Sequence, residues 1–208
     1  EARGMSMHES QSLFVEMQIA RSKPFAQFAA PHFAEAFGIH VDAEALYAQA
    51  TRVKRGLIRV EADEVTYPAH ILLRYTLEKA LLADELAVDD LPGAWAEQMQ
   101  ALLGLTPNSD MDGCMQDVHW PGGSIGYFPT YVLGHMIAAQ LKAAMLKDIP
   151  DFDSQVADGD FMPIRAWLGN KVHRWGSKFG TMELLQQATG EALNPTYYEQ
   201  HLRTRYAA

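Results

Sequence analysis

The spacing of apolar residues is the feature that most restricts what this chain of 208 residues can fold into. Segments whose apolar residues recur every three or four positions far outnumber segments in which apolar and polar residues alternate. The first pattern is typical of helices and the second of strands. Because 48% of the residues are hydrophobic, the chain can also bury a sizeable core. The sequence therefore predicts a mainly α-helical, multi-helix protein with residues 1–208 in a single domain.

Two neighbouring segments differ in pattern: the first predicts a strand and the second predicts a helix. GLIRVEA alternates around its arginine and predicts one short strand from Gly56 to Ala62. Residues 63–86 predict a long buried helix. Its broad apolar face is expected to carry Ile71, Leu72, Tyr75 and Leu82.

A further helix is predicted at 91–104, closed by Gly104. Three closing helices are predicted at 162–179, 181–190 and 194–206.

The charge balance and the single cysteine exclude several classes of protein. Acidic residues outnumber basic ones 26 to 17, and the formal net charge is -9. Nucleic-acid binding depends on clustered Lys and Arg, so we expect no nucleic-acid partner. Cys114 alone cannot form an internal disulfide or a cysteine-rich zinc module. A single cysteine fits a reducing compartment, so we expect a cytoplasmic protein. No apolar run approaches the roughly 18 residues that span a bilayer, so we expect no membrane partner.

A His-Glu pair near the start of the chain is the first candidate site. His8 and Glu9 open a predicted helix, but the zinc-binding pattern H-E-x-x-H is not completed, because position 12 is Ser12. Adjacent helical residues point about 100° apart, so at most one of the pair binds a given metal ion. Glu16 lies about two helical turns after Glu9. It either supports a metal ligand or belongs to a polar face of the helix that is exposed to solvent. An acidic residue in a first turn also commonly serves the helix dipole alone.

Arg59 is the second candidate, because it stands between apolar residues and is followed by two acids. One interpretation is a structural ion pair with Glu61, with Asp63 or with another neighbouring acid. The other is a buried guanidinium that receives the carboxylate of a ligand. The sequence of this segment alone leaves both interpretations open.

The segment GCMQDVHW places Gln116, Asp117 and His119 within four positions. A single histidine in a loop is more often a satisfied hydrogen-bonding residue than a catalyst. Tyr127 and Tyr131, however, follow eight and twelve positions after the histidine. A histidine and a tyrosine together can donate two hydrogen bonds to one developing oxyanion, so this segment is a candidate catalytic site.

Together, the segments HESQS, IRVEAD and GCMQDVHW resemble the thermostable (Taq-type) metallocarboxypeptidase family. That family is marked by the boxes H-E-[SG]-Q, [IV]-R-x-x-A-D and G-x-x-Q-D-x-H-W, and all three are intact in this sequence. The resemblance covers nearly the whole chain, and three separate boxes are a specific signal. It implies a mainly helical, two-lobed enzyme that removes the C-terminal residue of peptides, with this chain forming part of the catalytic lobe.

The resemblance also implies a zinc site. In this family zinc is held by two histidines of an H-E-x-x-H helix, whose glutamate is the general base, and by the glutamate of the H-E-[SG]-Q box. Glu9 would then be the third zinc ligand. Glu16 and Asp117 would not touch the metal or the substrate but would support the residues that do. H-E-x-x-H itself is absent. We therefore expect residues 1–208 to be the C-terminal part of a longer carboxypeptidase, which needs an N-terminal part with H-E-x-x-H as its partner and binds zinc weakly without it.

The same resemblance implies the substrate contacts. Arg59 would bind the free carboxylate of the peptide, with Gln116 as a further substrate contact. His119 and a tyrosine would stabilise the oxyanion, and Tyr131 is preferred to Tyr127 by analogy with related helical zinc peptidases. A homodimer is a further implication of the family.

One alternative from another class remains, because H-E-x-x-H is absent: a catalytically inactive helical binding or structural module. An unrelated helical enzyme that uses Asp117 and His119 without a metal would need a nucleophile, and none stands out in the sequence.

Overall fold

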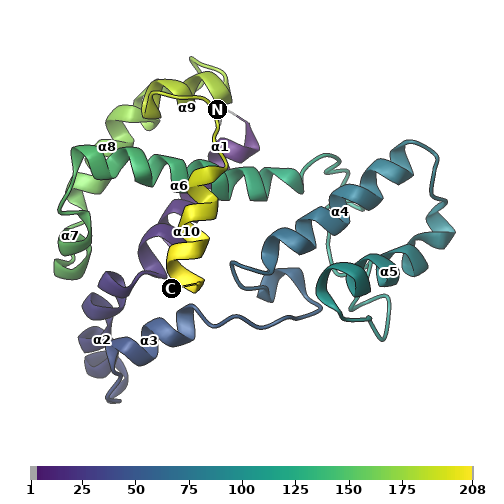
Figure 1. Ribbon diagram of the computed structural model, residues 1–208, viewed down its shortest axis with the longest axis horizontal. Helices are drawn as coiled ribbons and strands as arrows, with labels where there is room; N and C mark the ends of the chain where they lie inside the picture. The colour runs from purple at the N-terminus through teal and green to yellow at the C-terminus, as the bar shows by residue number, and fades with distance from the viewer. Residues whose placement is uncertain (1–3, 208) are drawn as a thin grey trace. The chain divides into compact units, whose positions relative to one another are not determined.

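The computed structural model describes residues 4–207, and every regular element in that range is helical, which confirms the predicted mainly α-helical fold (Figure 1). The α-helices are α1 (Met5–Leu13), α2 (Lys23–Phe37), α3 (Ala43–Ala50), α4 (Tyr67–Leu82), α5 (Leu91–Leu103), α6 (Pro129–Asp148), α7 (Phe152–Asp158), α8 (Met162–Lys171), α9 (Thr181–Thr189) and α10 (Thr196–Tyr206). A π-helix, η1 (Phe14–Ala20), continues α1, and short 3-10 turns occur at Arg59–Glu61, Val88–Asp90 and His173–Trp175. None of the helices in residues 4–207 is long and apolar enough to cross a membrane.

The helices form two compact units. The first contains the residues up to Thr51 together with those from Leu133 onward, and the second contains Arg52–Val132. The first unit carries α1, η1 and the closing helices, and the second carries α4 and α5. A single domain over residues 1–208 was predicted from the sequence, and it remains a prediction, because two compact units can also belong to one domain.

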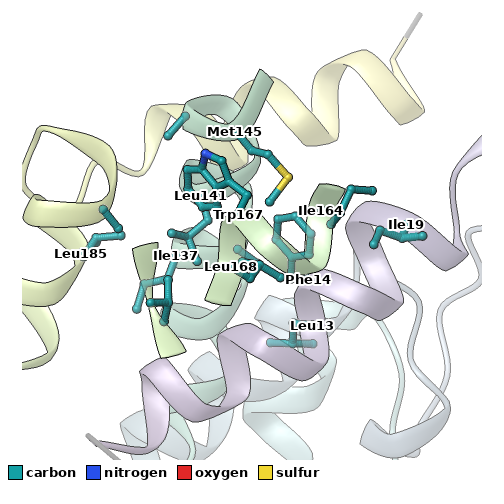
Figure 2. Close-up of a cluster of buried hydrophobic side chains, with 14 of the residues drawn as sticks. Leu13, Phe14, Ile19, Ile137, Leu141, Met145, Ile164, Trp167, Leu168 and Leu185 are labelled. Carbon is teal, nitrogen blue, oxygen red and sulfur yellow. The ribbon is translucent and has the colours of Figure 1, made fainter. Parts of the chain in front are cut away.

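The first unit is built around a continuous apolar core (Figure 2). Fully buried side chains from η1, α6 and α9 line it: Phe14, Ile137, Leu141, Met145 and Leu185. Trp167 and Leu168 of α8 pack on the same cluster. Burying each large apolar side chain contributes roughly 1.5–3 kcal/mol. This core therefore fixes the α1–η1 segment, which carries Glu9, against α6.

Local sequence signals explain where several helices start and stop. The Ser22 hydroxyl caps α2 by accepting a hydrogen bond from Phe25 N at 3.2 Å. Pro24 fits the first turn of that helix, where its missing N–H costs nothing. Gly104 ends α5 with φ 68°, a left-handed conformation that glycine adopts without steric cost. The predicted end at Gly104 is confirmed, and the three closing helices are present as α8, α9 and α10. The first of them is shorter than the predicted 162–179, because α8 ends at Lys171 and a 3-10 turn follows.

The short strand predicted from Gly56 to Ala62 is wrong. Arg59–Glu61 form a single 3-10 turn, and the described part of the chain contains no strand. Arg59 is 7% exposed and Val60 is 73% exposed, the reverse of the burial expected from the alternating pattern. The reason is polar anchoring: Arg59 N donates to Gln116 Oε1 at 2.8 Å, so a backbone group that a strand would offer to its neighbour is used by a side chain.

The apolar face predicted for the long helix is only partly correct. Helix α4 buries Ile71. Three residues expected on the same buried face are instead largely exposed, at 50%, 43% and 66%: Leu72, Tyr75 and Leu82. The helix buries polar residues in their place: His70, Arg74 and Glu78. Burying polar groups requires hydrogen-bonding or charged partners, and the second unit supplies them for Arg74 and Glu78.

Candidate active site

A buried cluster of charged side chains organises the second unit. Asp117 Oδ1 accepts a hydrogen bond from Arg59 Nε at 2.8 Å and lies 2.7 Å from Arg59 Nη2. Asp117 Oδ2 accepts from Arg74 Nε at 2.6 Å. No side chain of the three is more than 8% exposed. Buried charges are very costly unless they are paired and hydrogen-bonded, so this pairing keeps the cluster stable. An ion pair of Arg59 is therefore present, and its partner is Asp117, which is neither of the two acids named from the sequence, Glu61 and Asp63.

Gln116 connects both arginines to the surrounding loop. Its Oε1 accepts hydrogen bonds from Arg59 N and from Arg74 Nη2, both at 2.8 Å. Its Nε2 lies 2.9–3.1 Å from three backbone carbonyl oxygens, those of Leu57, Asp112 and Gly113. Both ends of the amide are thus occupied within the protein. These contacts fix the position of Arg59 relative to the loop that carries Asp117.

The last acid of the I-R-x-x-A-D box has a local structural role. Asp63 Oδ1 accepts hydrogen bonds from the backbone nitrogens of Val65 and Thr66, both at 2.9 Å. Asp63 Oδ2 accepts from Lys54 N at 2.9 Å. An aspartate that binds backbone nitrogens two and three positions ahead makes a turn that commonly precedes a helix. Asp63 therefore sets the direction in which the chain leaves Arg59 and enters α4.

The charged cluster carries one net positive charge, because two guanidinium groups face one carboxylate. Burial by itself raises the pKa of the Asp117 carboxyl, but Arg74 and Arg59 outweigh burial and hold that pKa below its usual value. Burial lowers the pKa of Arg74 to about 10, despite the opposing effect of Asp117. All three groups are therefore ionised near neutral pH.

His119 lies beside this cluster and contacts Tyr131. Its Nε2 is 3.0 Å from the Tyr131 hydroxyl, and the imidazole tautomer decides which of the two donates. The His119 ring packs on Phe128 with 4.3 Å between ring centroids. Burial, and after it the charge of Arg59, lowers the pKa of His119 and favours the neutral ring. His119 Nδ1 is 3.9 Å from Asp117 Oδ1, which is too long for a hydrogen bond.

Aromatic rings complete the site. The Tyr127 ring centroid is 5.4 Å from that of His119 and 5.3 Å from that of Tyr131. Arg59 Cζ lies 5.2 Å from the centre of the Tyr131 ring, and Arg59 Nη1 donates to the Tyr67 hydroxyl at 2.9 Å. The structure thus brings together six residues that the sequence singled out: Arg59, Gln116, Asp117, His119, Tyr127 and Tyr131.

Three members of the site were missed by sequence reasoning: Tyr67, Arg74 and Glu78. Glu78 fixes the conformation of the loop 120–126, because its two carboxylate oxygens accept hydrogen bonds from Trp120 Nε1 and from Gly126 N, both at 2.6 Å. Arg74 and Glu78 stand four positions apart on a helix that is otherwise rich in apolar residues. Two opposite charges at that spacing within such a segment were the available signal.

Glu9 and Glu16 belong to the first unit. The partly exposed Glu9 lies on α1, where Ser12 Oγ is 3.4 Å from Glu9 Oε2. Glu16 lies in η1 and pairs with Arg21 at 2.6 Å. Because the helix changes from α to π at Phe14, Glu16 does not follow Glu9 by two regular α-helical turns.

Gly134 allows α1 and α6 to approach closely at Glu9. A Cβ atom added at Gly134 would stand 3.0 Å from Glu9 Cβ, 3.0 Å from Leu13 Cδ1 and 3.2 Å from Ser10 N. Those distances are shorter than ordinary van der Waals contact, so a larger residue would push the two helices apart. The backbone position of Glu9 therefore depends on glycine at this point of α6.

The described residues match a metal site only in part. Glu9 offers one carboxylate, a ligand type that zinc accepts. Residues 4–207 contain no group of three or more His, Cys, Asp or Glu placed to hold a metal ion. A catalytic zinc site uses three protein ligands and keeps one position open. The part of the chain that the structure describes can therefore supply one ligand of such a site.

Comparison with known proteins puts this helical fold among the metallopeptidases. The sequence model of the family described as Carboxypeptidase Taq (M32) metallopeptidase matches residues 1–206. The chain belongs to this family, and the resemblance carried by the three sequence boxes is thereby confirmed.

The relatives are carboxypeptidases from bacteria, archaea and a trypanosome. Carboxypeptidase 1 of Bacillus subtilis (strain 168) is 43% identical, over 100% of this chain and 42% of that protein. Thermostable carboxypeptidase 1 of Pyrococcus furiosus is 44% identical, over 97% of this chain and 41% of that protein. The solved structure of Trypanosoma cruzi metallocarboxypeptidase 1 superposes with a TM-score of 0.96 at 44% identity, covering 100% of this chain and 44% of that one. The chain thus spans less than half the length of these relatives.

Proposed function

We propose that the protein acts in the hydrolysis of peptides from their C-terminal end. In this proposal the chain supplies the binding site for the free terminal carboxylate and the groups that stabilise the transition state. The observation that carries the proposal is the state of the buried Arg59 guanidinium. Its contacts with Asp117 and Tyr67 use Nε and one N–H of each terminal nitrogen. Two of the five N–H groups are left for a ligand.

The charge of the site supports a carboxylate as that ligand. Arg59, Arg74 and Asp117 together carry one positive charge in a buried position. A guanidinium fork matches the two oxygens of a carboxylate in geometry as well as in charge. A peptide with a free C-terminus would neutralise the cluster, whereas a peptide amide or an internal peptide bond would not. Recognition of this kind restricts cleavage to the last peptide bond.

His119 and Tyr131 are proposed to stabilise the negative charge that develops on the scissile carbonyl oxygen. The two groups are held 3.0 Å apart, a spacing from which both can point at one oxygen atom. The lowered pKa of His119 keeps its ring neutral near pH 7, so it acts as a hydrogen-bond donor and not as a cation. Donors fixed before the reaction strengthen their bonds as charge develops and so lower the barrier. Tyr127 packs against both rings and is the second choice for the tyrosine.

Glu9 is proposed as one ligand of a catalytic zinc ion, with H-E-x-x-H histidines from outside these 208 residues as the others. Zinc in such a site supplies polarisation of the substrate carbonyl and a lowered pKa for bound water. The chain presents Glu9 from α1, whose position depends on the close packing at Gly134. Glu16 lies in the π-helix η1, which follows α1, and would stabilise it through the ion pair with Arg21.

Gln116 and Asp117 are proposed to act through Arg59. Gln116 is fully engaged by backbone carbonyls and by both arginines. Asp117 is held by the same two guanidinium groups. Both side chains therefore orient the carboxylate-binding arginine from behind.

Two peptides of identical sequence test the proposal, one ending in a free carboxylate and the other in an amide. The protein is assayed together with the segment that completes its zinc site, and the products are identified by mass spectrometry. We expect loss of single C-terminal residues from the acid and no loss from the amide. Cleavage of both peptides at the same internal bond and at similar rates would contradict the proposal.

A further inference from the structure

We propose that Arg74 determines the specificity for a free carboxylate by keeping Arg59 available to the substrate. Arg74 shares the carboxylate of Asp117 with Arg59, so the negative charge of Asp117 does not neutralise Arg59 completely. The inference rests on the proposed function of Arg59, and it assigns a positioning role to a residue of α4 that lies outside the three sequence boxes.

The two oxygens of Asp117 are divided between the two arginines. Oδ1 takes Nε and Nη2 of Arg59 at 2.8 and 2.7 Å, and Oδ2 takes Nε of Arg74 at 2.6 Å. Asp117 uses Nε and one N–H of Nη2 of Arg59, and Tyr67 uses one N–H of Nη1, so one N–H on each terminal nitrogen remains for a ligand. Because Arg74 binds the other oxygen of Asp117, this one carboxylate faces two guanidinium groups, and one positive charge remains to attract the carboxylate of the substrate.

Arg74 itself is fixed from several sides. It is 0% exposed, and its Cζ lies 4.6 Å from the centre of the Trp95 ring. Its Nη1 donates to the carbonyl oxygen of His70 at 2.9 Å, and its Nη2 donates to Gln116 Oε1 at 2.8 Å. A fully buried guanidinium with these partners cannot reach a substrate. Any effect of Arg74 on the reaction must therefore pass through Asp117, Gln116 and the electric field of the site.

The charges of the site favour the same role. Glu78, the nearby buried acid of α4, is held by the neutral donors Trp120 Nε1 and Gly126 N. Asp117 is therefore the carboxylate that both arginines share. Without Arg74, Asp117 and Arg59 would form a neutral pair, and the site would lose its attraction for a further carboxylate. Burial and then Arg59 and Arg74 lower the pKa of His119, against the opposing effects of Asp117 and Glu78, which agrees with a positive field at this ring.

Substitution of Arg74 with and without Asp117 tests the inference. The measured quantity is the ratio of kcat/KM for the free-acid peptide to that for the peptide amide, in the zinc-completed protein. Arg74→Gln should lower this ratio by about tenfold, mostly through KM, because Asp117 then neutralises the charge of Arg59 alone. Arg74→Lys, which keeps the charge, should retain most of the ratio. Asp117→Asn combined with Arg74→Gln should restore it, because no carboxylate then competes with the substrate.

A purely structural role predicts different results. Arg74→Gln would then lower thermal stability and leave the ratio unchanged, and adding Asp117→Asn would cause a further loss instead of a recovery. The NMR titration of the His119 ring gives a second readout without turnover, since Arg74→Gln should raise the pKa of His119 and Arg74→Lys should not.

Two outcomes separate this inference from the proposed function. If the unsubstituted protein shows no preference for the acid, the proposed function fails. If it shows the preference and Arg59→Ala removes it while Arg74→Gln keeps it, only the role of Arg74 fails. Should Arg74→Gln not fold by circular dichroism, Arg74→Lys decides: the preference for the acid should persist in that variant with the pKa of His119 unchanged, and loss of the preference would overturn the inference.

Discussion

Removal of one hydroxyl group, by Tyr131→Phe, should slow turnover strongly and disturb the fold little. The substitution keeps the ring and therefore its packing, which includes Arg59 at 5.2 Å and the Tyr127 ring at 5.3 Å. It removes the hydroxyl that lies 3.0 Å from His119 Nε2. In the folded ground state the hydrogen bond with His119 is lost, and such a bond is worth roughly 1 kcal/mol of unfolding free energy.

The transition state loses more, because the same hydroxyl would face an oxygen that has become negative. Removing one such donor typically costs about 3–4 kcal/mol, so kcat should fall by roughly two to three orders of magnitude with KM and zinc content nearly unchanged. The assay is steady-state release of the C-terminal residue by the zinc-completed protein, with thermal melting as the measure of folding.

Tyr127→Phe is the matched control and should reduce kcat much less. His119→Ala should also lower kcat, and the double variant with Tyr131→Phe should lose less than the sum, because both donors serve one oxygen atom. A silent Tyr131→Phe together with an inactive Tyr127→Phe would show that the wrong tyrosine was chosen. If both tyrosine variants kept full turnover, the oxyanion role of this aromatic segment would be refuted.

The remaining predictions concern metal, pH and packing. The isolated 208-residue chain should bind Zn²⁺ weakly by calorimetry and hydrolyse no peptide, because Glu9 alone cannot supply three ligands; loss of helical circular dichroism on chelation would instead reveal a structural metal. Burial, followed by Arg74 and Arg59, lowers the pKa of His70 to about 4, so the folded protein favours the neutral ring. Stability should therefore fall by up to about 3 kcal/mol as the pH drops from about 6.5 to about 4, and urea melts of His70→Leu should lose this slope. Gly134→Ala should lower the free energy of unfolding by about 1–3 kcal/mol and weaken zinc binding in the completed protein, whereas unchanged zinc affinity would separate Glu9 from this packing.

The helices were predictable from sequence because their signals are local. The 3.6-residue spacing of apolar residues and the stop at Gly104 depend on neighbours within a few positions. The strand around Arg59 failed for the opposite reason. Its pattern was read as local, but the contacts that shape this turn come from Gln116 and Asp117, more than fifty positions away.

The candidate site was predictable only where sequence boxes mark it. Arg59 and His119 stand in such boxes, and the structure brings them to one cluster with Tyr131. Arg74 and Glu78 were missed because they lie on a helix whose apolar content suggested a plain hydrophobic face. Burial of a charged residue depends on a partner distant in sequence, and neither apolar periodicity nor helix propensity contains that information.

The central claim is that Arg59 recognises the free carboxylate of the substrate, and the most direct test compares acid and amide peptides in Arg59→Ala and in the unsubstituted protein. Truncating one partner of a desolvated charge pair commonly costs roughly 2–5 kcal/mol, so the unsubstituted protein should prefer the acid by about thirtyfold or more. In Arg59→Ala the ratio of the two kcat/KM values should fall close to one, through loss of the acid substrate alone. An Arg59→Ala variant that melts at a lower temperature but keeps the full preference for the acid would show that Arg59 serves only as a structural ion pair with Asp117.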